Sequence, residues 1–458
     1  MGGVVALGFT LLSACGGGSG AGTGDAQGGG AGAGASSAGG ALGQAGHGAP
    51  NGGSGGVASS AGGQGALGSA GQSSGGAAGI GQAGAGQAGA GQAGAGQAGA
   101  GQAGAGQAGG AGVQAGNPDG SCSAGIPARG KPVVTTQATT VVGTGTATSC
   151  TFSALNAAVT KGGIVTFDCG SAPLTIAVSS TLNVPSDKNT VIDGGNRITL
   201  DGGNSVQILR FYSANFRAND NSLTLQHLTL QNGKTTPTEV IPVAPAPCSQ
   251  GYNDGEGGAL YMRDGGLNVI DCVFKSNHGA PLGPDTGGGA IYVLGSKPGV
   301  VIANSTFSNN DASNGGGVGA LFSELNIYNS LFTGNKAIGH DANNNEPSKC
   351  SAMNNDQNET GSGGNGGPIY SDGASVNVTL CGDQIVGNSA GVNAFGGGLF
   401  FTSNDFGGTL SIADTKMTGN TGGSWTSVKS GSVMNAGTAV GTNAKSITIT
   451  NSVLQGVP

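Results

Sequence analysis

Three charged residues stand around a Gly-Gly turn and are the first candidates for chemistry. Asp254 and Glu256 precede Gly257 and Gly258, and Arg263 follows the short apolar stretch that comes next. Two neighbouring carboxyls can act as acid and base on a glycosidic bond. The same residues also fit a solvated turn followed by a surface charge, so they leave the question of catalysis open.

The stretch from Lys336 to Gly366 carries many oxygen ligands. These are Asp341, Asn343, Asn344, Asn345, Glu346, Asp356 and Glu359, together with the imidazole of His340. Carboxylate and amide oxygens suit Ca²⁺, but the spacing matches no known calcium loop. A polar insertion explains the composition equally well. We therefore predict no dedicated metal site and no cofactor, with calcium as the one ion left open.

Five aromatic residues recur at one place in a repeated motif and form the candidate binding site. They are Tyr261, Tyr292, Phe322, Tyr370 and Phe400. Each follows an apolar residue in a short strand-like stretch, and Arg263, Glu324 and Asp372 continue the same side two residues later. Strand parity then places the five rings outward, where a strip of aromatics is suited to stacking on sugar rings. The alternative is that the rings pack in the core or beneath neighbouring loops.

The cysteines indicate where the protein resides. Eight cysteines fit export to an oxidising compartment. Cys150 and Cys169 bracket a short helix and strand and are predicted to form a disulfide. The sequence does not decide the pairing of Cys122, Cys248, Cys272, Cys350 and Cys381.

The N-terminal residues predict an anchor and a spacer. Residues 4–12 are apolar and lead into Leu12-Ser13-Ala14-Cys15, which resembles the bacterial lipobox, so residues 1–15 are expected to be a signal peptide with lipidation at Cys15. A chance cysteine after an apolar run is the alternative. Residues 16–121 are mostly Gly, Ala, Ser and Gln and predict a disordered linker. We expect a lipid-anchored protein of the cell envelope, on the outer membrane by default, with an extracellular domain over residues 122–458.

The remaining residues follow a repeated pattern with two apolar pairs per copy. The copies begin at Leu223, Leu267, Val300, Leu325, Val378, Leu410 and Ile447. Each pair alternates with period two, but the phase slips by one between the pairs, so a strand must bend there. The bend positions hold residues that tolerate the left-handed conformation: His227, Asp271, Asn304, Asn329, Gly382, Asp414 and Asn451. This assigns His227 to a corner rather than to catalysis.

Further landmarks complete the prediction of the fold. An asparagine follows most copies, at Asn277, Asn310, Asn335, Asn388 and Asn420, and a loop, a glycine and a third strand come after it. Residues 151–161 read as a short helix that ends at Gly162 and caps the N-terminal end. The expected fold is all-β, a right-handed parallel β-helix (solenoid) with an N-terminal capping helix.

The Gly-Gly-Ala-Ile and Phe-x-x-Asn spacing resembles the repeat of polymorphic outer-membrane proteins, within the pectin-lyase-like superfold. The resemblance covers residues from about Val133 onward and implies a β-helix. It says little about activity, because the superfold hosts adhesins, lyases and hydrolases. The Arg-x-Pro-x-x-Arg stretch of pectate lyases and the aspartate signatures of polygalacturonases are absent.

These observations favour a binding protein over an enzyme. We expect a non-catalytic protein that binds a polysaccharide or a cell-surface glycan, as in adhesion. The alternative is a polysaccharide lyase or glycoside hydrolase. A net charge of −7 with only 9% charged residues argues against a nucleic-acid partner.

Overall fold

The computed structural model describes residues 115–238, 255–283, 285–340, 363–392, 394–422 and 439–455, and the backbone of 426–427 and 434–435. Cys15, Cys248, Cys350, Asp254 and most of the polar stretch 336–366 lie outside these ranges. Within the described part the chain is mainly β, with one α-helix. None of its helices is long and apolar enough to cross a membrane.

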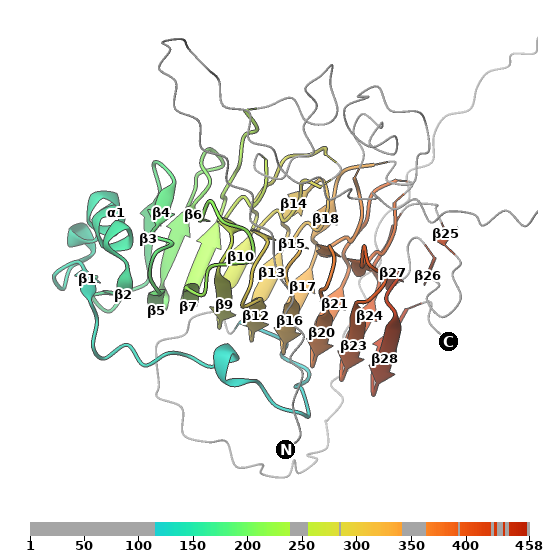
Figure 1. The fold of residues 1–458 in the computed structure, drawn as a ribbon. Coiled ribbons are helices and arrows are strands. Elements are labelled where there is room, and N and C mark those ends of the chain that lie inside the picture. The colour runs from blue at the N-terminus through green and yellow to red at the C-terminus, as the bar shows by residue number, and fades with distance from the viewer. Residues whose placement is uncertain are drawn as a thin grey trace, which may run out of the picture. The chain divides into compact units, whose positions relative to one another are not determined.

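The larger sheet, called sheet A, contains two strands from most repeats, and every pairing in it is parallel (Figure 1). The expected apolar positions are in register: Leu267 pairs with Val300, Val300 with Leu325, and Leu325 with Val378. Its strands are β1 (Thr140–Val142), β2 (Gly163–Phe167), β3 (Leu174–Ala177), β5 (Thr190–Asp201), β7 (Ser222–Gln231), β9 (Gly266–Ile270), β10 (Val273–Lys275), β12 (Val300–Ala303), β13 (Thr306–Ser308), β16 (Leu325–Tyr328), β17 (Leu331–Thr333), β20 (Val378–Cys381), β21 (Gln384–Val386), β23 (Thr409–Ala413), β24 (Lys416–Thr418), β28 (Ser446–Thr450) and β29 (Val453–Leu454).

The smaller sheet, called sheet B, takes one strand from each repeat and is also parallel. In sheet order, which is also chain order, its strands are β4 (Leu182–Val184), β6 (Leu209–Tyr212), β8 (Leu260–Arg263), β11 (Ile291–Leu294), β15 (Val318–Leu321), β19 (Ile369–Asp372), β22 (Leu399–Phe401) and β27 (Val440–Thr442). Two short strands, β14 (Asp311–Ala312) and β18 (Lys336–Ala337), form a third parallel pair. Only β25 (Thr426–Ser427) and β26 (Met434–Asn435) pair antiparallel in the described part.

The predicted corners are confirmed by the backbone. All seven positions have a positive φ, from 46° at Asn451 to 74° at Gly382. A left-handed residue turns the chain sharply, so both apolar pairs of a copy face the same interior despite the slip in phase. The interior is closely packed: Phe274, Phe307 and Phe332 stack with ring centroids 4.9 and 4.7 Å apart. Parallel pairing from repeat to repeat is compatible with a solenoid.

The asparagine landmarks form a buried ladder. The side-chain amide of Asn277 donates to the Oδ1 of Asn310 over 2.9 Å, and the same bond joins Asn310 to Asn335, Asn335 to Asn388, and Asn388 to Asn420. The Oδ1 of each acceptor in these bonds also accepts the backbone N–H of the preceding asparagine. A buried amide is costly unless its groups are paired, so the register of these repeats is fixed here.

A second buried ladder follows the corners. Ser305, Ser330, Asp383, Thr415 and Ser452 occupy equivalent positions, and each side-chain oxygen accepts a backbone N–H from the preceding repeat. Asp383 is the only carboxyl among them. Burial raises its pKa to about 8, although the N–H groups of Ser330 and Cys381 donate to it and oppose the shift.

The predicted capping helix is present as α1 (Phe152–Lys161). Thr151 caps it by accepting a hydrogen bond from the N–H of Ala154, and Gly162, with φ of 68°, ends it. Leu155, Ala158 and Val159 are buried, and the helix packs against β1 and β4 at one end of the sheets (Figure 1). The predicted disulfide between Cys150 and Cys169 brackets this helix and β2, with 5.7 Å between the Cα atoms.

An irregular segment, residues 115–139, crosses the repeats and is called the strap. Its backbone and side chains bond successively to later and then earlier repeats: Asn117 to Asn329 and Gly382, Arg129 to Asn268 and Gly299, Val133 to Gln226, Thr135 to Asp193, and Thr139 to Ile164. The 3₁₀ helix η1 (Ala128–Gly130) lies within it (Figure 1). Residues 116–121, assigned to the linker by composition, therefore contact the sheets.

Candidate functional site

The expected exposed strip of aromatics is wrong for four of its five residues. Tyr261, Tyr292, Tyr370 and Phe400 lie on the outer face of sheet B, yet their exposed fractions are only 0 to 3%. They form a packed ladder instead: Tyr261 and Tyr292 stack with centroids 6.2 Å apart, and Tyr370 and Phe400 with 5.6 Å. Parity predicted the face of the strand correctly but said nothing about what covers it.

Phe322 does not belong to this ladder. Tyr292 pairs with Gly319, and Gly319 pairs with Tyr370, so glycine fills the aromatic position in β15. A Cβ on Gly319 would lie 2.8 Å from the Tyr292 ring, which explains why that position has no side chain. Phe322 follows the strand with φ of 51° and packs edge-on against Phe216, with centroids 5.5 Å apart.

Two carboxyls and two tyrosines meet on the middle of this face, and we call them the carboxyl–tyrosine cluster. The hydroxyl of Tyr370 lies 3.4 Å from an oxygen of Asp285 and 3.3 Å from an oxygen of Asp372. The hydroxyl of Tyr292 donates to the main-chain carbonyl of Asp285 over 2.7 Å. Thr402 donates to the other oxygen of Asp372 over 2.7 Å.

The environment of the cluster changes its acid–base behaviour. Burial raises the pKa of Asp372 to about 6, while hydrogen bonds from Thr402, Gly373 and Tyr370 oppose the shift. A carboxyl that titrates near neutral pH can donate or accept a proton, but Asp372 and Asp285 are only 3% and 1% exposed, so the cluster is closed to a ligand in this structure. The sequence singled out Glu256 and Arg263 instead: Glu256 is buried, and Arg263 is half-buried at the end of β8.

A row of polar side chains marks the edge from which the insertions leave, and we call it the edge row. It runs through Lys234, His278, Asp311, Lys336, Ser389 and Thr421, which pair in parallel register. These residues are exposed or half-buried, and the Nδ1 of His278 lies 2.9 Å from the Oδ2 of Asp311. Sequence reasoning missed this row, although its last five members each follow a landmark asparagine directly.

His227 occupies a corner, as predicted. Its Nδ1 lies 3.0 Å from Asp193 and its Nε2 lies 3.7 Å from Asp271. The hydrogen bond to Asp193 raises the pKa of His227. Burial alone would raise the pKa of Asp193, but its hydrogen bonds lower that pKa to about 2. The imidazole therefore links carboxylates of neighbouring repeats, a structural arrangement without a nucleophile.

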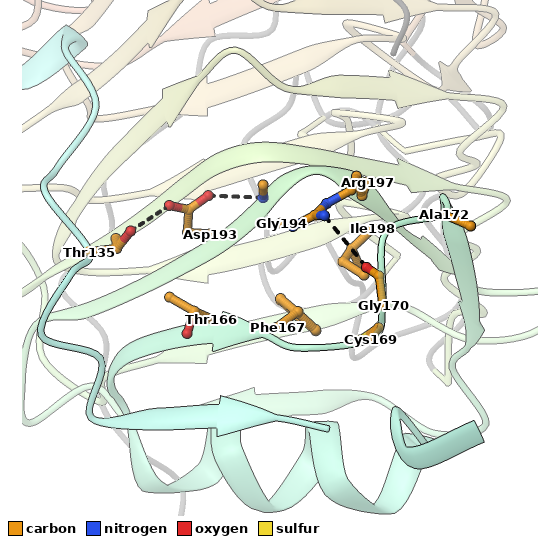
Figure 2. Close-up of a pocket in the computed structure, with 11 residues that line it drawn as sticks. Thr135, Thr166, Phe167, Cys169, Gly170, Ala172, Asp193, Gly194, Arg197 and Ile198 are labelled. Atoms are coloured by element: carbon orange, nitrogen blue, oxygen red, sulfur yellow. Dashed lines mark hydrogen bonds between the residues drawn. The ribbon is translucent and has the colours of Figure 1, made fainter. Parts of the chain in front are cut away.

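A cleft of about 150 Å³ lies beside this corner, between the strap, the end of β2 and β5 (Figure 2). Asp193 turns toward the hydroxyl of Thr135, 2.8 Å away, and Arg197 toward the carbonyl of Gly170, 3.5 Å away. These polar groups bond to one another rather than converge on a shared point. The cleft therefore presents no set of acid, base and nucleophile.

The described cysteines offer neither a metal site nor a nucleophile. Cys122, Cys381 and Asp414 come close together, but the two sulfurs form a disulfide and cannot bind a metal as thiolates. Cys272 is fully buried, which raises its pKa to about 12 and keeps the thiol protonated. Any oxygen ligands for calcium in residues 341–362 lie outside the described residues.

Two candidate sites remain, the outer face of sheet B and the edge row. The first combines aromatic rings, carboxyls and arginines, and the second is polar and accessible. Comparison with known proteins adds no assignment: no family model, no curated protein and no solved structure matches this chain.

Proposed function

We propose that this chain is a lipoprotein of the cell envelope. Lipidation of Cys15 anchors it, and the linker that precedes the strap holds it away from the membrane. Residues 122–458 form a right-handed parallel β-helix of the pectin-lyase-like superfold, with repeats of the polymorphic outer-membrane-protein type. Parallel register from repeat to repeat, left-handed corners and the asparagine ladder support this fold.

The domain functions, in this proposal, by binding a polysaccharide or cell-surface glycan without cleaving it. The observation that carries the proposal is the open end of the outer face of sheet B, where the ring of Tyr212 is 39% exposed and stands beside the guanidiniums of Arg210 and Arg263. Carbohydrate sites combine ring surfaces with a few oriented polar groups. The edge row adds exposed hydrogen-bonding groups where the insertions begin, and loops on a rigid scaffold commonly carry recognition.

One panel of measurements tests this function. The full-length chain with Cys15→Ser, prepared without lipid, is mixed with uronate-containing and neutral polysaccharides, with calcium and with a calcium chelator. Retention and the molar mass of each polysaccharide are measured in the same samples. The proposal expects retention of at least one polysaccharide with its molar mass unchanged. Absence of retention throughout, or a fall in molar mass, contradicts it.

Hydrolysis or lyase chemistry is the second candidate, and the carboxyl–tyrosine cluster favours it. Asp285 and Asp372 share the hydroxyl of Tyr370, as an acid–base pair could, but both carboxyls are buried, so a substrate reaches them only if the chain around them opens. If the panel shows cleavage, Asp372→Asn should abolish it while Glu324→Gln, a carboxyl outside the cluster, leaves it unchanged. Cleavage that survives Asp372→Asn would place the chemistry elsewhere.

A further inference from the structure

Arginine and tyrosine alternate on the outer face of the first two long strands of sheet B. Arg210 in β6 pairs with Tyr261 in β8, and Tyr212 pairs with Arg263, so all four side chains lie on the same face of the sheet. The guanidinium of Arg210 lies 4.6 Å from the centroid of the Tyr212 ring and 5.8 Å from that of Tyr261. The guanidinium of Arg263 lies 5.6 Å from the centroid of Tyr212.

This end of the face is open, unlike the aromatic ladder further along. Tyr212 is 39% exposed, and both arginines are half-buried. Tyr261 lies beneath them. Its burial raises the pKa of its hydroxyl, and the negative charge of Glu256 raises that pKa further. The two guanidiniums are therefore held against rings while part of the surface faces solvent, an arrangement that keeps their planes fixed.

The arginines of the chain are few, and their uses differ. The sequence holds five, Arg129, Arg197, Arg210, Arg217 and Arg263. Arg129 and Arg217 bind main-chain carbonyls and so fasten the strap and the 213–221 segment. Arg210, in contrast, has no hydrogen bond and no ion pair within the described residues. Its five N–H donors, oriented by two tyrosines in a chain of net charge −7, remain available to an anion.

We propose that the surface formed by Arg210, Tyr212 and Arg263 binds the acidic group of a polysaccharide, a carboxylate or a sulfate. The sugar ring stacks on the exposed part of Tyr212, and the guanidinium of Arg210 donates two parallel hydrogen bonds to the acidic group. Arg263, whose guanidinium lies 5.6 Å from the centroid of the same ring, adds a second positive charge. This inference rests on the proposed glycan binding and specifies the class of glycan.

The test uses the full-length Cys15→Ser chain and four probes: polygalacturonate, dextran sulfate, neutral dextran and vesicles of anionic phospholipid. Arg210→Gln removes the guanidinium, and Arg197→Gln is the matched control, because it removes the same charge from an exposed arginine elsewhere. Dissociation constants are measured by calorimetry at two salt concentrations, and thermal melting confirms that both variants fold.

The expected result is that Arg210→Gln weakens binding of polygalacturonate, dextran sulfate or both by about tenfold, whereas Arg197→Gln does not. The response of the two acidic polymers shows whether carboxylate or sulfate is preferred. Equal losses in both variants would indicate nonspecific charge attraction and overturn the inference. Arginine-dependent binding of vesicles in place of polysaccharide would overturn it as well.

The same measurements separate this inference from the proposed function. Retention of neutral dextran alone, unaffected by Arg210→Gln, would refute the acidic-group site but keep glycan binding. If the chain binds none of the polysaccharides, both the acidic-group site and the proposed glycan binding are refuted. If Arg210→Gln itself melts at a lower temperature, Tyr212→Ala provides the second variant, because Tyr212 is exposed and its loss should also weaken binding of the acidic polymer.

Discussion

Cys122 and Cys381 form a disulfide that joins two positions separated by 259 residues. The disulfide attaches the strap to the end of β20. In addition, the backbone N–H of Cys122 donates a hydrogen bond to the Oδ1 of Asn329 over 2.7 Å. The next residue, Ser123, bonds to Asp414 over 2.8 Å. The chain that follows the linker is thus fastened to late repeats before it reaches the first strand.

Loss of this disulfide should destabilise the protein more than loss of the Cys150–Cys169 disulfide. Closing a longer loop removes more entropy from the unfolded chain, and the difference between the two loops is roughly 2 kcal/mol in the chain-entropy account. We expect Cys122→Ser with Cys381→Ser to lower the free energy of unfolding further than Cys150→Ser with Cys169→Ser, measured by urea denaturation. The reverse order would show that the strap contributes little.

The asparagine ladder should be sensitive to the loss of one member. Asn335→Ala leaves the backbone N–H and the amide of Asn310 without their acceptor in a buried environment, at a cost of about 3 kcal/mol. Asn326→Ala is the matched control, because within the described part of the chain the Asn326 side chain accepts no hydrogen bond and donates to Glu324 alone, near the surface. Urea denaturation of the two variants measures the difference. Similar midpoints would argue against the ladder as a source of stability.

Asp383 should make stability depend on pH. Its pKa rises from the usual acidic value to about 8 on folding, so the folded state binds the proton more tightly and the protein loses stability as pH rises between about 4 and 8. Asp383→Ser copies the residue of neighbouring repeats and removes this loss. The difference in the free energy of unfolding between the variant and the wild type should therefore move in favour of the variant as pH rises, as measured by denaturation at several pH values. A constant difference would contradict the raised pKa.

Lipidation at Cys15 predicts the location of the protein in cells. The wild-type chain should fractionate with the membrane and incorporate labelled fatty acid, because buried acyl chains contribute about 0.8 kcal/mol per methylene to membrane binding. Cys15→Ser should shift the protein to the soluble fraction and abolish labelling. Labelling that persists in Cys15→Ser would refute Cys15 as the anchor.

The sequence predicted those parts of the fold that repeat. Left-handed residues at each corner and asparagine at each landmark reflect local constraints, and the sequence predicts both, as it predicts α1 with its end at Gly162. The position of Phe322 was misread because the motif Gly-Ala-Leu-Phe fits two registers. The pairing of Gly319 with Tyr292, where a Cβ would lie 2.8 Å from the ring, decides between them.

The candidate site is harder to predict, because its contacts join residues that do not recur at a regular spacing in the sequence. The strap has no apolar alternation, so neither its path nor the partner of Cys122 could be read from spacing. The carboxyl–tyrosine cluster brings Asp285 from a loop to Asp372 at the end of a strand 87 residues later. Arg210 and Tyr212 lie before the first recurring Gly-apolar-aromatic motif, so the spacing of the aromatic repeats does not point to them.

Side-chain oxidation of Tyr212 tests most directly the claim that glycan binds on the outer face of sheet B. Hydroxyl-radical footprinting with mass spectrometry compares Tyr212 with Tyr328, a partly exposed tyrosine of β16 in sheet A, with and without the polysaccharide that the protein retains. The account predicts that bound polysaccharide protects Tyr212 and leaves the oxidation of Tyr328 unchanged. Unchanged oxidation of Tyr212 at saturating polysaccharide, or protection of Tyr328 alone, would contradict it.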